Sequence, residues 1–418
     1  MKITIVNTSD IRGGAAIAAF RLFKVIHEKF PGTRMLAREK LSLTMNVRGL
    51  NNTFWQRFFI KFRFVLEAIS FIYWSKSRED WFAFSTACTG QNISHLPEIR
   101  DADLIHLHWI NSGFLSLKNI SEIADTGKPV VWTLHDMWAF TGGCHYSGSC
   151  INYLENCGNC LFLKSPGSKD LSYRIHREKQ KLWASANISF IAVSYWMAEC
   201  ARKSSLAGSS RIVVIPNPID TEVYKPADKA TIRDELGLPQ STFLILAGAA
   251  NLQDKRKGFV YLMEALRQMK ETIPEIGRSF GLITFGKASN IDNSPVEYYP
   301  QSYLKDDYAI ARLYQAADVF VLPTLEDNLP GTVMESLACG TPVVAFNVGG
   351  IPDMIDHKTT GYLAELKNVS DLIEGINWVK SHPMIQQVEE NCRKKVVENF
   401  SNEVVAAKYI DFYRSLIQ

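Results

Sequence analysis

Short apolar runs rich in β-branched residues alternate with longer segments of helical periodicity along most of the chain. This alternation is typical of parallel sheets that are covered by helices. We expect nine strands, at residues 2–8, 103–108, 129–135, 188–194, 211–216, 243–249, 281–285, 318–323 and 342–346. Because this many strands will not fit one small sheet, the sequence predicts an α/β protein with two doubly wound, Rossmann-like domains.

A proline-punctuated stretch lies between the fifth and sixth expected strands. Pro216-Asn217-Pro218-Ile219-Asp220, followed by Pro226, cannot carry a regular helix, which indicates a domain connection. We place the N-terminal domain at residues 1–215 and the C-terminal domain at residues 216–398. Residues 399–418 are expected to form a helix that packs back on the N-terminal domain.

The charge balance and the apolar runs narrow the expected partners and compartment. The chain has 46 Lys and Arg against 43 Asp and Glu, and its formal charge of +3 gives no general field for nucleic acid. The first strand lacks the features of a signal peptide. No window offers the roughly 18 uninterrupted apolar residues that a membrane span needs. We therefore expect a cytoplasmic protein without a nucleic-acid partner.

An insertion at residues 51–81 is unusually aromatic. Its aromatic residues are Phe54, Trp55, Phe58, Phe59, Phe62, Phe64, Phe71, Tyr73, Trp74 and Trp81. Arg57, Lys61 and Arg63 lie among them. One interpretation is an amphipathic element that rests on a membrane surface near a lipid-linked substrate. The other, which aromatic stripes at helical spacing favour, is a helix packed on its own domain.

Gly13 and Gly14 follow the first strand and precede a helical pattern. Bare backbone at a helix N-terminus lets an anion approach free N–H donors, so both glycines are candidate ligand-binding residues. The segment is not a G-x-G-x-x-G fingerprint and gives little support to nicotinamide or flavin binding. A tight turn without a ligand is the alternative.

The segment 317–342 predicts a buried strand, a loop and a short helix that begins near Thr332. Ligands of open α/β sheets bind at this carboxyl edge. Candidates to bind a diphosphate are the backbone N–H groups of Gly331, Thr332 and Val333. Glu335 could accept hydrogen bonds from a ribose. The alternative for Glu335 is a capping box with Thr332, because the two residues have that spacing.

This segment resembles the signature of the retaining glycosyltransferases grouped as family 4, which have the GT-B fold of two Rossmann-like domains facing across a cleft. Residues 214–220 resemble the family's domain junction, and Lys257-Gly258 resembles its basic loop. Residues 338–344 complete the pattern. The resemblance implies that a sugar nucleotide, the donor, binds the C-terminal domain, with Gly13, Gly14 and Asn217 among its contacts.

The resemblance also implies roles for single residues. Asp327, eight positions before Glu335, would contact the donor sugar; the family usually has glutamate there, and Glu326 is the alternative. Arg256 and Lys257 would stabilise charge that develops on the diphosphate, without a divalent metal. The family's arginine usually precedes its lysine by several residues, whereas here the two are adjacent. In isolation this pair is more typical of a solvated basic turn.

His135 ends an expected strand of the first domain. The resemblance implies that it contacts the donor sugar beside the reacting centre. A hydrogen-bonded structural histidine is the alternative. Asp136 follows it, but neighbours in a strand point to opposite faces, so the sequence does not predict that the two form a pair.

Four of the eight cysteines, Cys144, Cys150, Cys157 and Cys160, fall in a loop expected at residues 141–165. In a chain without an export signal, a thiolate metal site is favoured over disulfides. Four thiolates suit a structural zinc ion and leave no open position for catalysis. An iron–sulfur cluster and free thiols are the alternatives.

These observations predict a retaining hexosyltransferase, in which no cofactor is expected for catalysis. Its donor would be a UDP- or GDP-sugar and its acceptor a glycan or a lipid-linked glycan of surface polysaccharide biosynthesis. Peripheral contact with the inner face of the membrane would follow from a lipid-linked acceptor. A sugar-nucleotide epimerase of the same fold and a non-catalytic carbohydrate- or partner-binding protein are the alternatives.

Overall fold

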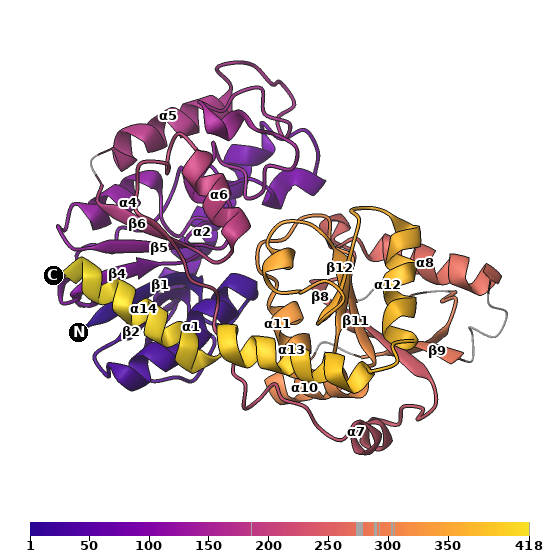
Figure 1. Cartoon of the computed structure of the whole chain (residues 1–418). Coiled ribbons are helices and arrows are strands. Elements are labelled where there is room, and N and C mark those ends of the chain that lie inside the picture. Colours follow the sequence, from indigo (N-terminus) through magenta and orange to yellow (C-terminus); the bar gives the residue numbers. More distant parts are fainter. Residues whose placement is uncertain are drawn as a thin grey trace. The chain divides into compact units, whose positions relative to one another are not determined.

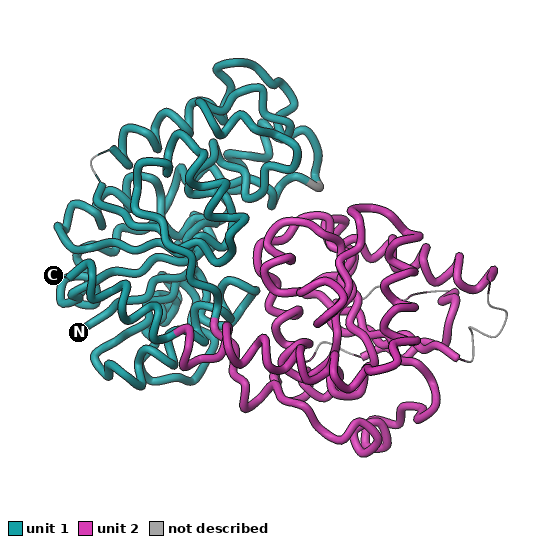
Figure 2. Tube along the Cα trace, viewed as in Figure 1, with its two compact units in different colours: residues 1–217, 406–418 teal, residues 218–405 magenta. Residues whose placement is uncertain are grey.

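The computed structural model describes residues 1–417 apart from 185, 273–278, 288–290, 292, 302–303 and 305. It divides into two compact units (Figure 2), of which unit 1 comprises residues 1–217 and 406–418 and unit 2 comprises residues 218–405. Each unit is a parallel sheet with helices (Figure 1), which confirms the predicted α/β class with two Rossmann-like domains. Residue 418, the last of the expected C-terminal helix, lies outside the described residues.

The described strands of unit 1 form one sheet in the order β3-β2-β1-β4-β5-β6-β7. The strands are β1 (Ile3–Ser9), β2 (Arg34–Glu39), β3 (Val47–Gly49), β4 (Leu104–Leu107), β5 (Val130–Leu134), β6 (Ile188–Ala192) and β7 (Ile212–Val214). The α-helices are α1 (Gly14–Lys29), α2 (Phe54–Ile72), α3 (Pro97–Arg100), α4 (Leu117–Ala124), α5 (Leu171–Trp183) and α6 (Tyr195–Lys203). Short 3-10 turns are η1 (Glu79–Phe82), η2 (Trp138–Phe140) and η3 (Asn152–Leu154). All residues of β1, β4, β5 and β6 are buried, as expected for a parallel sheet covered on both faces.

Unit 2 has a second parallel sheet, in the order β10-β9-β8-β11-β12-β13. Its strands are β8 (Phe243–Asn251), β9 (Phe280–Lys287), β10 (Glu297–Pro300), β11 (Val319–Leu322), β12 (Val343–Phe346) and β13 (Gly361–Ala364). Its helices are α7 (Lys229–Leu236), α8 (Phe259–Thr272), α10 (Asp307–Ala316), α11 (Gly331–Ala338), α12 (Val369–Lys380) and α13 (Ile385–Phe400), with 3-10 turns η4 (Lys255–Lys257) and η5 (Ile351–Asp353).

The last helix, α14 (Asn402–Ile417), begins in unit 2, and its residues from Ala406 onward belong to unit 1. There Tyr409 and Tyr413 are completely buried. The Tyr413 hydroxyl makes a 2.7 Å hydrogen bond with Nδ1 of His106 on β4. The final helix is therefore part of the core of unit 1.

Both sheets reverse their strand order at one point, between β1 and β4 in unit 1 and between β8 and β11 in unit 2. Open α/β sheets bind ligands at the carboxyl ends of the strands on either side of such a switch. The loops that begin there carry Gly13 and His108 in unit 1, and Arg256 and Asp327 in unit 2. The topology thus brings most of the candidate residues to the ligand-binding edge of their own unit.

Helix α2 packs on its own unit through one narrow face only. Only Ile60, Glu67 and Phe71 among its residues are buried. Its large exposed apolar residues are Phe54, Trp55, Phe58, Phe59, Phe62, Phe64, Val65, Leu66 and Ile69. Most of its apolar surface therefore faces outward. Within the described part of the chain, no helix is both long and apolar enough to traverse a bilayer.

Candidate functional site

The basic turn of unit 2 is held against the loop that follows β11. Asp254 caps the turn by accepting a hydrogen bond from the Arg256 backbone N–H at 2.9 Å. The Arg256 carbonyl in turn accepts hydrogen bonds from the Leu325 N–H and the Thr324 hydroxyl. Gly258 has φ +66°, and a Cβ there would lie 1.8 Å from the Pro323 carbonyl oxygen. Glycine is thus needed for the close approach of the two loops.

Arg256, Lys257 and Asp327, all predicted site residues, form one charged cluster. Lys257 Nζ lies 2.5 Å from Asp327 Oδ2, and Arg256 Nη1 lies 3.7 Å from the same oxygen. Arg256 Nη1 also donates to the Glu326 carbonyl at 2.7 Å. Burial acts to raise the pKa of Asp327, but the charges of Lys257 and Arg256 outweigh it and hold that pKa below its usual value. The pair is therefore not a solvated basic turn.

Asp327 itself is buried, and its backbone is fixed by the loop after β12. The Gly350 N–H donates to the Asp327 carbonyl at 3.2 Å. Its neighbour Glu326 contributes its backbone carbonyl to Arg256, as described above. The Asp327 carboxylate contacts both members of the basic pair.

Helix α11 starts one residue earlier than expected, at Gly331, with Pro330 as its N-cap and no side-chain capping bond. The capping-box alternative for Thr332 and Glu335 is therefore wrong. Glu335 is buried, and its Oε2 accepts a hydrogen bond from the Tyr314 hydroxyl at 3.3 Å. The Val333 N–H donates to the Pro330 carbonyl at 3.1 Å. Of the three predicted amides, those of Gly331 and Thr332 are the better placed for an anion, since the first helical amides have no intrahelical acceptor.

Gly13 and Gly14 lie at the start of α1 in unit 1. Gly13 is the N-cap with φ +96°. Apart from the neighbouring residues and the backbone of α1 itself, no heavy atom of the described chain lies within 4 Å of the position that a Cβ on either glycine would take. The turn therefore leaves open space at the helix start. Asn217 is buried and is the last residue of the first segment of unit 1. A joint role of these residues with those of unit 2 stays a prediction.

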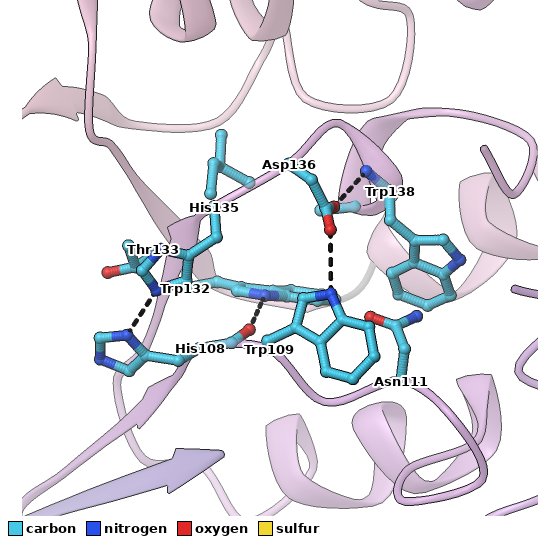
Figure 3. A pocket seen from close by; sticks show the side chains of 10 residues that line it. His108, Trp109, Asn111, Trp132, Thr133, His135, Asp136 and Trp138 are labelled. Atoms are coloured by element: carbon cyan, nitrogen blue, oxygen red, sulfur yellow. Dashed lines mark hydrogen bonds between the residues drawn. The ribbon is translucent and has the colours of Figure 1, made fainter. Parts of the chain in front are cut away.

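His135 lies in a small pocket at the carboxyl ends of β4 and β5 (Figure 3), with a cavity volume of about 10 Å³. Its Nε2 makes a 2.9 Å hydrogen bond with Nδ1 of His108, the residue after β4. Burial lowers the pKa of His135 to about 4 and that of His108 well below its usual value. Both imidazoles are thus neutral at pH 7, and His135 belongs to a histidine pair that the sequence did not predict.

Asp136 pairs with a different residue, His145, which comes from the cysteine-rich loop. His145 Nδ1 lies 2.7 Å from Asp136 Oδ2, and its Nε2 lies 2.9 Å from the Ser85 hydroxyl. Trp109 Nε1 donates to the same Asp136 oxygen at 2.9 Å. Burial acts to raise the pKa of Asp136, but His145 and these hydrogen bonds lower it overall. No spacing in the sequence indicates the Asp136–His145 pair, because the backbone turn between them creates it.

The four clustered cysteines, Cys144, Cys150, Cys157 and Cys160, line one pocket and are free thiols. Cys157 Sγ accepts a hydrogen bond from the Gly142 N–H at 3.1 Å. Burial raises the pKa of Cys157 to about 12. As the side chains stand, no group of three or more His, Cys, Asp or Glu in the described chain is arranged to hold a metal ion. Zinc in this pocket stays a prediction.

Comparisons with known proteins agree with this division into two units. Residues 61–223 match the family described as Glycosyltransferase Family 4, and residues 243–381 match the family described as Glycosyl transferases group 1. The chain belongs to the family 4 glycosyltransferases. In this glycosyltransferase the second match contains the Arg256–Lys257–Asp327 cluster and Glu335, and the first contains His108, His135 and the cysteines.

Relatives of this glycosyltransferase include a colanic acid biosynthesis glycosyl transferase of Escherichia coli, 25% identical over 75% of this chain and 76% of the relative. An E. coli UDP-Gal:α-D-GlcNAc-diphosphoundecaprenol α-1,3-galactosyltransferase is 26% identical over 50% of this chain and 55% of its own length. The chain thus spans about half of the second relative.

Solved structures confirm the GT-B fold. The Anabaena protein HepE, solved in complex with UDP, has a TM-score of 0.65 at 17% identity, with all of both chains covered. A glycosyltransferase from Rickettsia africae has a TM-score of 0.65 at 16% identity, covering 100% of this chain and 99% of its own. At such identities the likeness bears on the fold alone.

Proposed function

We propose that this glycosyltransferase transfers a sugar with retention of anomeric configuration, from a UDP-sugar to a glycan or a lipid-linked glycan of a surface polysaccharide. The observation that carries the proposal is the cluster of Arg256, Lys257 and Asp327 at the sheet edge where α11 begins. A relative that acts on a UDP-sugar and a diphosphoundecaprenol-linked acceptor supports the donor and acceptor classes.

The chemistry of sugar transfer fits these groups. Cleavage at the anomeric carbon leaves negative charge on the diphosphate, and donors aimed at that charge stabilise the transition state. Arg256 and Lys257 supply two cations, and the amides of Gly331 and Thr332 add dipoles at the start of α11. Asp327 keeps both cations oriented before the donor arrives. Glu335, whose Oε2 accepts a hydrogen bond from the Tyr314 hydroxyl, would accept hydrogen bonds from the ribose. These groups suffice without a divalent ion.

A donor panel tests this proposal. The purified chain is incubated with UDP-glucose, UDP-galactose, UDP-N-acetylglucosamine and GDP-mannose, with and without a diphosphate-lipid acceptor, and products are followed by NMR. Transfer with the donor's anomeric configuration, unchanged by EDTA, supports the proposal. Inversion contradicts retention, epimer formation favours the epimerase, and binding without turnover favours a binding protein. UDP affinity should fall at least tenfold in Lys257→Ala and Glu335→Ala. Lys255→Ala is the control, since Lys255 is exposed, and it should leave UDP affinity unchanged.

We also propose that α2 binds an anionic bilayer surface, which would bring the enzyme to a lipid-linked acceptor. At 100° per residue, the exposed positions 54, 55, 58, 59, 62, 65, 66 and 69 fall within an arc of about 140°. The buried residues Ile60, Glu67 and Phe71 lie on the opposite side. Arg57 and Lys61 lie beyond one edge of the apolar arc, and Arg63 lies beyond the other. An outward apolar face with basic margins is the pattern of an interfacial helix, and monomeric soluble proteins rarely expose so large an apolar patch.

Vesicle sedimentation tests the membrane contact. We expect binding to vesicles of phosphatidylglycerol and phosphatidylethanolamine, weaker binding to phosphatidylcholine alone, and loss of binding in Phe58→Ser/Phe62→Ser. Phe82→Ser is a matched control, because Phe82 is 79% exposed but lies outside α2. Equal sedimentation of the double variant, or a concentration-dependent dimer that buries α2, would contradict the proposal.

A further inference from the structure

A tyrosine of the neighbouring helix contacts the Glu335 carboxylate inside unit 2. Tyr314, on α10, is completely buried, and its hydroxyl donates to Glu335 Oε2 at 3.3 Å. A buried phenol hydroxyl usually has a hydrogen-bond partner. A buried carboxylate needs donors, because burial removes its contacts with water. The contact between α10 and α11 thus holds one of the two carboxylate oxygens.

The other carboxylate oxygen lies at the start of α11. Glu335 is four residues after Gly331. Residues at this spacing share one face of a helix, and their side chains tilt toward its N-terminus. A Cβ on Gly331 would lie 3.6 Å from Glu335 Oε1. The carboxylate therefore has Oε2 bonded to α10 and Oε1 beside the amides proposed to bind the diphosphate.

The tyrosine is fixed by contacts with the sheet and with the loop after α11. Its ring packs edge to face against Phe320 on β11 and Phe285 on β9, at centroid distances of 5.4 and 5.9 Å. The Tyr314 carbonyl accepts a hydrogen bond from the Thr341 hydroxyl at 2.7 Å. Neither the ring nor the backbone can shift without loss of these contacts. The hydroxyl is therefore a donor of fixed position.

We propose that Tyr314 is a positioning residue for recognition of the nucleotide's ribose, and that it acts through Glu335. The role rests on the proposed function, which assigns the ribose to Glu335. A carboxylate that rotates must be ordered when the ribose binds, and ordering one such side chain costs a factor of about 2 to 12 in affinity. The Tyr314 hydroxyl imposes this order in the free protein. The site thereby discriminates more strongly between nucleotides with and without ribose hydroxyls than Glu335 alone would.

A double-mutant cycle that includes the hydroxyls of the ligand tests this role. The full chain is titrated calorimetrically with UDP and with dideoxy-UDP, which lacks both ribose hydroxyls. Wild type should bind dideoxy-UDP about tenfold or more weaker than UDP, because Glu335 then has no hydroxyl to bind. Tyr314→Phe keeps the ring and its packing. It should bind UDP about fivefold weaker and dideoxy-UDP as wild type does, so that the ratio of the two affinities falls to about twofold.

A merely structural role of the hydroxyl would give a different pattern. Equal losses for the two nucleotides, or unchanged UDP affinity in Tyr314→Phe, would overturn the proposal. In the Glu335→Ala background, Tyr314→Phe should cause no further loss of UDP affinity. A further loss would show that the tyrosine acts by another route and would also overturn it. In transfer assays Tyr314→Phe should raise KM about fivefold and change kcat by less than about twofold, and the reverse pattern would contradict a role in binding.

Tyr362→Phe is the matched control. Tyr362 is also buried in unit 2, and its hydroxyl donates to a carboxylate oxygen, Asp371 Oδ1, at 2.8 Å. Neither residue belongs to the candidate site, so the affinity ratio should stay as in wild type. If the wild-type chain does not bind UDP at all, the proposed function fails and the role of Tyr314 fails with it. If UDP binds and Tyr314→Phe leaves the ratio unchanged, only the role of Tyr314 fails.

Discussion

Removal of the Lys257 ammonium should destabilise unit 2 in a pH-dependent way. In Lys257→Ala the buried Asp327 carboxylate keeps only the longer contact to Arg256, at 3.7 Å. Loss of one partner of a buried ion pair costs about 3–5 kcal/mol. Because the Lys257 and Asp327 side chains remain 19% and 11% exposed, we expect about 2–3 kcal/mol at pH 7. At about 2–4 °C per kcal/mol for a unit of this size, the melting temperature falls by roughly 4–12 °C.

The pH dependence follows from the pKa of Asp327, which lies below its usual value in the folded protein. The stabilisation from such a group is complete above the unfolded pKa, about 3.9, and is lost as the pH falls through the folded pKa. In Lys257→Ala only Arg256 still opposes the effect of burial, so the pKa of Asp327 rises. Protonation then relieves the buried charge, so the variant recovers stability on acidification. The difference from wild type should shrink between pH 7 and pH 4.5.

Differential scanning calorimetry of the full chain over this pH range measures the effect. Lys255→Ala is the control, since Lys255 is an exposed lysine of the same turn. Asp327→Asn should reduce the pH dependence of the Lys257→Ala effect, because no carboxylate remains to be protonated. A Lys257→Ala difference that is constant or grows toward acid pH would refute the reasoning.

Three further predictions concern other parts of the chain. Gly258→Ala should lower the melting temperature more than Gly237→Ala does, and it should also weaken UDP binding in calorimetry. Both glycines have φ near +65°, but only at Gly258 would the added Cβ lie 1.8 Å from a carbonyl oxygen. Equal effects of the two substitutions would contradict this. Metal analysis should find close to one zinc per chain, lost in Cys157→Ser/Cys160→Ser, and a metal-free, fully folded preparation would disprove the zinc prediction. His145→Ala should destabilise unit 1 by about 1–3 kcal/mol in thermal unfolding, because buried Asp136 loses one of its hydrogen-bond partners. A variant as stable as wild type would show that the pair contributes nothing.

The sequence predicted nine of the strands because each contains a short run of apolar residues, most of them buried. It missed β2, β3, β10 and β13, of which β3 has only three residues and β10 is the edge segment Glu297–Pro300, with two tyrosines. Neither has the continuous apolar pattern of a central strand. The missed strands all lie toward the outside of their sheets, where fewer neighbours constrain composition.

The site was predictable where one loop carries it and unpredictable where distant segments meet. Asp327 and Glu335 follow one strand, and their family motif indicates both. By contrast, His108 and His135 become partners only because β4 and β5 are adjacent in the sheet. For α2 the sequence left two interpretations open, because the same aromatic periodicity fits burial in a core and contact with an external surface.

The position of α14 has a consequence for synthesis of the protein. Tyr409 and Tyr413 complete the core around His106, yet more than 180 residues that form unit 2 separate them from the rest of unit 1. Domains generally fold as they leave the ribosome, N-terminal part first. Here the first unit to be translated must wait with an open core until residues 406–417 have emerged, so unit 2 can reach its native state before unit 1 does.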